Sequence, residues 1–177
     1  MWIYSIVNEN HFNLDIYFMS TFIFDKYLDS NKEIKSISKE EVKNIAFTAF
    51  YLSSKYDSIV PFAIDNHPLI NVSVIKQLEI KILTTLNFNI KHNSSYYYIK
   101  YFFCDLSVKN KELIQELLLE KYITSLEKIS IAFVKLLTMD VSFYKFNQWL
   151  IAIGCMINGI NYIMDKASKI STDKNFS

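Results

Sequence analysis

Residues 49–59 read Ala-Phe-Tyr-Leu-Ser-Ser-Lys-Tyr-Asp-Ser-Ile, an apolar helical pattern that ends near a lysine. Residues 77–83 read Gln-Leu-Glu-Ile-Lys-Ile-Leu and place Glu79 inside a second apolar helix. A buried charge without a partner is costly, so charges on helices this apolar need partners. Lys55 and Glu79 are therefore a candidate pair. They form either a salt bridge that merely steadies two helices or part of a binding site.

The composition indicates a globular chain without a strong electrostatic signature. Its 177 residues suffice for one domain or two small ones, and 51% of them are hydrophobic. The formal charge is +1, so nothing favours binding to nucleic acid or to a membrane surface. All 19 basic residues are lysines, which excludes mechanisms that need a guanidinium group from this chain.

The residues that most often carry catalysis or bind metals are scattered. Cys104 and Cys155 lack metal-ligand spacing, and we expect buried, reduced thiols of an intracellular protein. His11, His67 and His92 have no acidic neighbours at ligand intervals, and there is no glycine-rich phosphate loop. We therefore expect no enzyme activity, no metal, no cofactor and no small-molecule ligand.

The longest uncharged run, residues 146–164, is long enough to cross a bilayer. Asn and Gln side chains interrupt it, and each of them would need a hydrogen-bond partner in lipid. A buried core helix is the better interpretation. The first residues have neither the basic segment nor the apolar length of a signal peptide.

Capping residues mark the helices of the first half. Asn13 is a candidate N-cap for a helix over 14–28, and Ser38 with Glu41 fits a capping box that opens a helix of about 18 residues. Asn71 caps the next helix, whose predicted buried stripe comprises Val74, Ile75, Leu78, Ile82, Leu83 and Leu86. Prolines bracket a short element around residues 62–64.

Further helices are expected over about 94–106, 111–138 and 143–166, with a break at residues 140–142. A polar tail that frays follows at 167–177. No segment alternates convincingly between apolar and polar residues, so the sequence predicts an all-α fold.

Several motifs occur in order along the first hundred residues. Trp2 lies in the first helix, residues 23–28 read Ile-Phe-Asp-Lys-Tyr-Leu, and residues 52–61 read Leu-Ser-Ser-Lys-Tyr-Asp-Ser-Ile-Val-Pro. Residues 78–90 and 96–103 follow at matching intervals. Together they resemble the N-terminal cyclin box, most closely that of A- and B-type mitotic cyclins.

This resemblance implies a cyclin fold: a five-helix cyclin box over 1–92, then a partial second helical repeat over 93–166 that lacks its last two helices. The family also has an arginine shortly before the position of Trp2, which pairs with an aspartate that matches Asp25. Met1 alone precedes Trp2 here. The first helix is therefore truncated, or upstream sequence exists. Trp2 is the remnant of the family's substrate-docking patch.

The resemblance further implies a non-catalytic regulatory subunit that binds and activates a cyclin-dependent serine/threonine protein kinase in cell-cycle control. Such a heterodimer is expected in the nucleus and cytoplasm. The implied kinase-binding residues are Lys55, Glu79, Leu52, Tyr56, Ile80, Leu83, Phe88 and Ile90. The alternative is a cyclin-fold scaffold, or a transcription-related protein, that binds partners without activating a kinase. That alternative predicts a basic face and no Lys/Glu pair.

Overall fold

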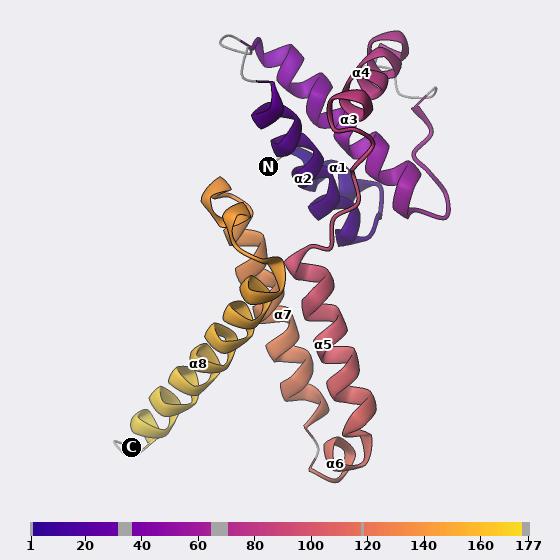
Figure 1. The fold of residues 1–177 in the computed structure, drawn as a ribbon. Coiled ribbons are helices and arrows are strands. Elements are labelled where there is room, and N and C mark those ends of the chain that lie inside the picture. Colours follow the sequence, from indigo (N-terminus) through magenta and orange to yellow (C-terminus); the bar gives the residue numbers. More distant parts are fainter. Residues whose placement is uncertain (1, 32–36, 65–70, 118, 175–177) are drawn as a thin grey trace. The chain divides into compact units, whose positions relative to one another are not determined.

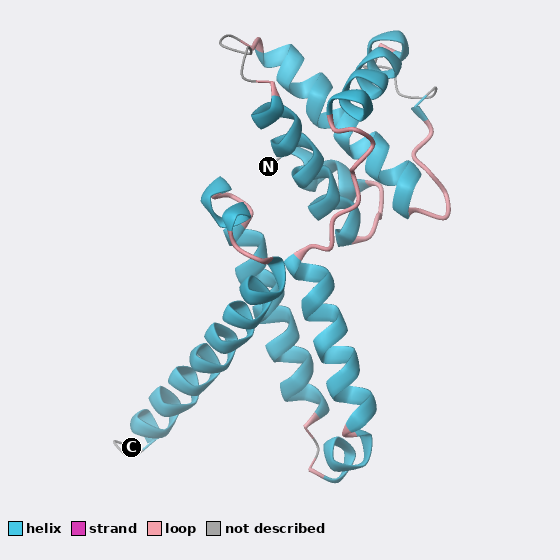
Figure 2. Cartoon of the chain, viewed as in Figure 1, coloured by secondary structure: helices cyan, strands magenta, loops and turns pink. Residues whose placement is uncertain are grey.

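The computed structural model describes residues 2–31, 37–64, 71–117 and 119–174. These residues form helices and connecting loops, with no strand among them, which confirms the all-α prediction (Figure 2). The chain divides into two compact units, residues 1–92 and residues 93–177. We describe each unit separately.

The first unit is built around one central helix. Its helices are α1 (Trp2–Glu9), α2 (Leu14–Ser30), α3 (Lys39–Asp57) and α4 (Val72–Thr85), and α3 packs on the other three (Figure 1). The helix α4 contains most of the segment that resembles the fifth helix of the cyclin box. The short element predicted around 62–64 contains a single residue of 3-10 helix, Ile64, and residues 65–70 lie outside the described part.

The predicted caps are confirmed. The Asn13 side chain accepts a hydrogen bond from the backbone of the first turn of α2, and Asn71 does the same for α4. Ser38 and Glu41 form the full capping box: the Glu41 N–H donates to Ser38 Oγ at 3.2 Å, and the Ser38 N–H donates to Glu41 Oε2 at 2.9 Å. Each cap satisfies N–H groups that have no partner within the helix.

The core of the first unit joins α2, α3 and α4. Its most deeply buried side chains include Ile23 and Tyr27 of α2, Ala49 of α3 and Ile82 of α4. In the predicted stripe of α4, Ile75, Ile82 and Leu86 are buried, and Val74, Leu78 and Leu83 are half-buried. The helical period therefore identified the correct face of α4.

The second unit consists of α5 (Ser95–Lys109), α6 (Lys111–Glu116), α7 (Glu120–Leu137) and α8 (Gln148–Lys174), with a 3-10 turn, η2, at Val141–Lys145. The longer helices α5, α7 and α8 pack on one another. At the α5–α8 contact, Ser95 Oγ donates a hydrogen bond to Gln148 Oε1 at 2.6 Å.

Three predictions for this unit were wrong in part. The helix expected over 111–138 is divided, because the chain turns after Glu116 and the Leu119 N–H donates to the Ile114 carbonyl at 3.0 Å. The last helix begins at Gln148 rather than 143, because Asp140 caps the η2 turn through the Ser142 N–H. It then continues to Lys174, through most of the segment expected to fray as a tail.

The thiols and the uncharged run also differ from expectation. Cys155 is buried, which raises the pKa of its thiol to about 11, but Cys104 is exposed. Residues 148–164 form one part of α8, yet several of their large apolar side chains are exposed rather than in a core. Among the described helices, none has the length and apolar character needed to cross a membrane.

Both glycines of the chain lie on α8, and their surroundings differ. A Cβ on Gly159 would lie 2.9 Å from Leu126 Cδ1 and 3.1 Å from Ser130 Oγ, so α7 and α8 approach closely there. A Cβ on Gly154 would meet no described atom within 4 Å. Packing inside the unit therefore requires glycine at 159 but not at 154.

This difference predicts opposite effects of two matched substitutions. Gly159→Ala is expected to lower the free energy of unfolding, because the new methyl group must displace the Leu126 and Ser130 side chains. Overpacking of this kind typically costs about 1–3 kcal/mol. Gly154→Ala is expected to raise the free energy of unfolding by about 0.5–1 kcal/mol, because alanine favours the helix. Urea unfolding at low protein concentration measures both values. Equal effects of the two substitutions would contradict the close approach at Gly159.

Candidate partner-binding site

Lys55 and Glu79 meet on the surface of the first unit. Lys55 lies in the last turn of α3 and Glu79 in the middle of α4, and Lys55 Nζ is 2.5 Å from Glu79 Oε1. The Lys55 side chain is 43% exposed and that of Glu79 is 15% exposed. The hydrogen bond to Glu79 raises the pKa of Lys55, and Lys55 Nζ also lies 5.1 Å from the centre of the Tyr51 ring. The predicted pair is therefore formed and remains accessible to solvent.

The six apolar residues predicted around this pair separate into two groups. Tyr56, Ile80 and Phe88 are exposed, and Leu83 is half-buried. Leu52 and Ile90 instead belong to the buried core, so a partner cannot contact them as surface groups. The pair together with exposed Tyr56, Ile80 and Phe88, from the last turn of α3, from α4 and from the segment after α4, is called the pair surface below.

The chain leaves α4 through an unusual backbone conformation. Asn87 and Phe88 have φ angles of 49° and 58°, in the left-handed region that side chains other than Gly and Asn rarely adopt. The Phe88 N–H donates to the Leu83 carbonyl at 2.8 Å, which closes the end of the helix. Such strain at a bulky residue costs about 1–3 kcal/mol and persists only where surrounding contacts fix it. The result is a Phe88 side chain that is 69% exposed.

Contacts from α2 hold the segment that follows. The His92 ring stacks on the Phe22 ring, with centroids 3.9 Å apart and planes 5° apart. Lys26 Nζ donates to the Asn89 carbonyl at 3.4 Å and lies 5.1 Å from the centre of the Phe22 ring. Sequence reasoning treated His92 as an isolated histidine and missed this cluster. The only signal was an aromatic residue and a lysine one helical turn apart, at 22 and 26.

Trp2 lies apart from the pair surface, on α1. Its side chain is exposed, and its ring centroid is 6.3 Å from that of Phe47 in α3. The tryptophan therefore packs on the α3 segment that precedes the fully buried Ala49 and Phe50, rather than on the last turn that carries Lys55. The exposed part of the ring is what remains for contact with another molecule.

The family model for the N-terminal domain of cyclins matches residues 1–91. The chain belongs to the cyclin family. The match covers α1 to α4 and the first residues after α4. Proteins with this domain are in general regulatory rather than catalytic, and the domain generally implies a kinase partner. A search of the curated proteins found no match to the chain.

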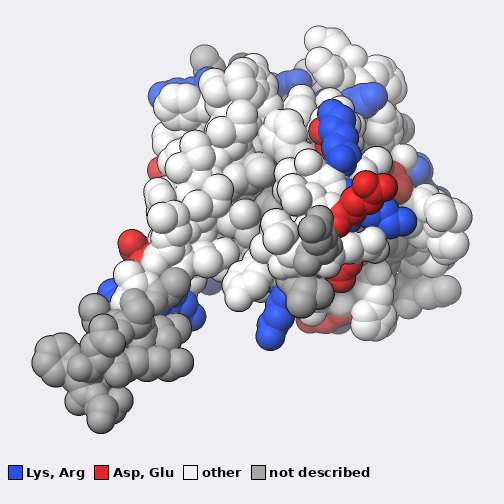
Figure 3. All heavy atoms as spheres, turned by 90° about the horizontal axis from the view of Figure 1, so that it is seen from below, with Lys and Arg blue, Asp and Glu red and all other residues white. Residues whose placement is uncertain are grey.

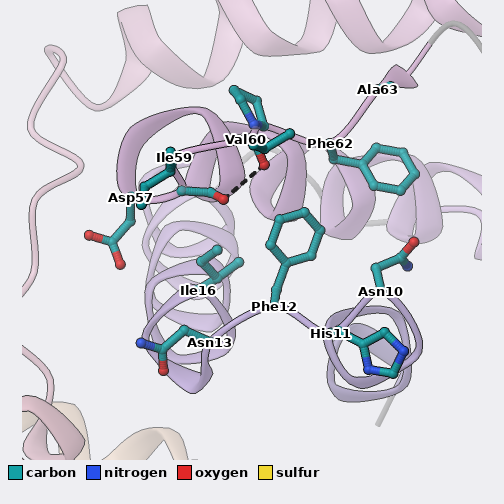
Figure 4. Close-up of a pocket in the computed structure, with 12 residues that line it drawn as sticks. Asn10, His11, Phe12, Asn13, Ile16, Asp57, Ile59, Val60, Phe62 and Ala63 are labelled. Carbon is teal, nitrogen blue, oxygen red and sulfur yellow. Dashed lines mark hydrogen bonds between the residues drawn. The ribbon is translucent and has the colours of Figure 1, made fainter.

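The cyclin box also contains a cleft that sequence reasoning did not identify. It has a volume of about 820 Å³ and lies between the α1–α2 turn and the segment that follows α3 (Figure 4). Phe12 and Ile16 line one side, and residues 57–63 line the other. Ser58 Oγ donates to the Val60 carbonyl at 2.8 Å, which fixes the loop at its rim. The lining is mixed in character and indicates no particular ligand.

Charged side chains do not form a large patch of one sign on the face shown in Figure 3, where lysines and acidic residues alternate in small groups. Within the described residues, no three His, Cys, Asp or Glu side chains gather closely enough to hold a metal ion. The Lys55–Glu79 pair instead joins two helices of the cyclin box through residues 24 positions apart.

The ion pair is expected to contribute little to stability. Exposed pairs are typically worth about 0–1 kcal/mol, because water screens them and two long side chains lose freedom. The double variant Lys55→Ala/Glu79→Ala should therefore change the free energy of unfolding by less than about 1 kcal/mol. Chemical unfolding measures this value. The matched control is Lys100→Ala/Glu127→Ala, which removes a 2.6 Å pair in the second unit. If Lys55→Ala/Glu79→Ala lowers the free energy of unfolding far more than the control variant does, a purely structural role of the pair is favoured.

The lowered pKa of His92 in the folded chain predicts that stability falls in acid. Burial, helped by the charge of Lys26, lowers the pKa of His92 from 6.5 to about 4. Between these two values the unfolded chain takes up a proton and the folded chain does not, so the stability falls as the pH falls from 6.5 to about 4. His92→Phe keeps a ring against Phe22 and removes the titration, so unfolding measured across this range should depend less on pH.

His92→Gln is the comparison for that experiment. It also removes the titration, but it loses the stacked ring, so it should be less stable than His92→Phe at every pH. If the stability of His92→Phe depends on pH as strongly as that of the unmodified chain, other groups cause the loss of stability in acid.

Proposed function

We propose that this chain is a cyclin that binds and activates a cyclin-dependent serine/threonine protein kinase in cell-cycle control. The observation that carries the proposal is the formed, accessible Lys55–Glu79 pair on α3 and α4, with exposed Tyr56, Ile80 and Phe88 on the same two helices and the exit of α4. These are the residues that match the kinase-binding positions of the cyclin box.

The pair has the chemistry to receive a helix end or a loop of a kinase. The Lys55 ammonium has three donors, and the bond to Glu79 uses one of them, so others can reach carbonyl or carboxylate oxygens of the partner. The second carboxylate oxygen of Glu79 can accept a backbone N–H. The apolar side chains exclude water, and this exclusion strengthens both kinds of contact, as in a binding hot spot.

Activation follows from a shift of population in the kinase. In the active arrangement, a glutamate of the kinase C-helix forms an ion pair with the catalytic lysine. A cyclin that binds this arrangement more tightly than the inactive one stabilises it by the difference in binding free energy. The chain needs no catalytic group of its own for this role.

The assignment to the mitotic cyclins rests on the sequence motifs. These motifs are most similar to those of A- and B-type cyclins, so we infer a mitotic role and a location in the nucleus and cytoplasm. Substrate docking through the patch that includes Trp2 should contribute little, because Ser5 and Lys43 replace a glutamate and a glutamine of that patch. A formed Lys/Glu pair and a near-neutral charge also argue against the scaffold alternative.

Co-purification with kinases of the cyclin-dependent family tests the proposal. The unmodified chain should retain such a kinase and raise phosphate transfer to a histone or peptide substrate. Lys55→Ala alone should weaken binding by about 2–5 kcal/mol, because it leaves Glu79 without its partner in a desolvated interface. Lys55→Ala/Glu79→Ala should weaken binding as well. Binding isotherms and initial rates with the same kinase preparation provide the measurement.

The control variant is again Lys100→Ala/Glu127→Ala, which removes an equivalent pair outside the cyclin box and should bind and activate normally. Retention of the kinase without activation would support the scaffold function instead. Binding that is unaffected by the changes at Lys55 and Glu79, or no kinase bound at all, would contradict the proposal.

A further inference from the structure

The direction of the Phe88 side chain depends on its backbone. The ring is exposed, and within the described residues it contacts no other aromatic ring. Its φ angle of 58° lies in the left-handed region, which phenylalanine adopts only at a cost in free energy. A change to a negative φ would remove that cost and turn the ring to another side of the chain. Contacts outside Phe88 therefore hold this conformation.

Local contacts at the end of α4 account for part of this restraint. The Phe88 N–H donates to the Leu83 carbonyl at 2.8 Å, and the Ile90 N–H donates to the Phe88 carbonyl at 3.1 Å. The side chains of Leu86 and Ile90 are buried in the core on either side of Phe88. These contacts set the two ends of the turn, but they do not determine the φ angle of the residue between them.

Three residues, Phe22, Lys26 and His92, join α2 to the segment that follows Phe88, and they are called the exit cluster below. Lys26 Nζ donates to the Asn89 carbonyl at 3.4 Å and lies 5.1 Å from the centre of the Phe22 ring. The His92 ring stacks on the Phe22 ring, with centroids 3.9 Å apart. Phe22 and Lys26 are one helical turn apart, so both side chains lie on the same side of α2.

The contacts of the exit cluster depend on orientation. A pair of stacked rings and a cation over a ring are favourable only in particular geometries, unlike general apolar packing. Burial, helped by the charge of Lys26, lowers the pKa of His92 to about 4, so the His92 ring is neutral near pH 7 and does not repel the ammonium group. The three side chains therefore favour one path of the chain after Phe88.

We propose that Phe22, Lys26 and His92 are positioning residues for kinase binding: they hold the segment after Phe88 on α2 and thereby fix the exposed Phe88 ring for contact with the kinase. This inference rests on the proposed function and concerns how one of its contact residues is placed. A ring that is fixed before binding loses less conformational entropy in the complex. The exit cluster therefore acts on affinity through Phe88 and needs no contact with the kinase itself.

Nuclear magnetic resonance of the full chain without a kinase tests the first step. The Lys26→Met/His92→Gln variant removes the ammonium group and the stacked ring. The HN–Hα coupling and the backbone chemical shifts of Phe88, which report φ, should move toward the values of a negative φ. His11, with a φ of 57° in the α1–α2 turn, is the internal control and should not change. Unchanged Phe88 signals, or equal changes at His11, would overturn the proposal.

Binding isotherms with a cyclin-dependent kinase test the second step. Lys26→Met/His92→Gln should weaken binding about tenfold, because a stacked ring and a charged hydrogen bond are lost. Adding both changes to Phe88→Ala should weaken binding no further, because the exit cluster acts through the Phe88 ring. Additive effects of the cluster variant and Phe88→Ala would overturn the proposal.

Two variants separate positioning from a change of charge or of bulk. Lys91→Met removes a positive charge from the same segment, but Lys91 is exposed and makes no hydrogen bond or ion pair within the described residues, so binding should stay unchanged. His92→Phe keeps a ring against Phe22 and should recover most of the binding that His92→Gln loses. Equal losses in His92→Phe and His92→Gln would contradict a role of the stack.

The same isotherms distinguish a failure of this inference from a failure of the proposed function. If Lys55→Ala weakens kinase binding but Phe88→Ala or the cluster variant does not, the inference is overturned and the proposed function stands. If the unmodified chain binds no kinase, the proposed function fails and the positioning role for a kinase fails with it. The Phe88 signals of the free chain then still decide whether the exit cluster fixes the Phe88 backbone.

Discussion

The burial of α3 among three other helices is the constraint on which the cyclin box depends. Ala49 and Phe50 are completely buried, and Thr48, Ser53 and Ser54 are buried with them. Each of these hydroxyls donates to a carbonyl of its own helix, at 2.6 to 2.9 Å. Small and internally satisfied side chains allow α1, α2 and α4 to approach α3 closely without an unpaired polar group. The two ends of α3 reach the surface, and the last turn carries Lys55.

The same packing positions the two helices that carry the pair surface. Lys55 is fixed by the central helix, and Glu79 by α4, which packs on it. Phe88 is fixed differently: its strained backbone is held between the buried side chains of Leu86 and Ile90, and the Phe22, Lys26 and His92 contacts tie the following residues to α2. A surface that is already ordered loses little conformational entropy on binding, so more of its contact energy appears as affinity.

Local signals predicted the parts of the fold that local chemistry determines. Asn13, Ser38 and Asn71 are caps because their side chains replace missing backbone partners, and this can be seen in a few consecutive residues. The Lys55–Glu79 pair was predictable because charges on apolar helices need partners. The burial of Leu52 and Ile90 could not be predicted in this way, because it depends on how α3 and α4 pack together. The left-handed Phe88 gave no signal, since phenylalanine disfavours that conformation.

The second unit shows where such reasoning fails. The turn after Glu116 contains neither glycine nor proline, so helix propensity alone continues through it. The uncharged run over 146–164 was interpreted as a core helix because apolar periodicity does not distinguish a side covered by the same chain from a side left for another. The two glycines of α8 show that sequence alone does not reveal packing either. A Cβ at Gly159 would meet Leu126 and Ser130 of α7, whereas one at Gly154 would meet no described atom within 4 Å. Both are the same residue on the same helix, and only the position of α7 distinguishes them.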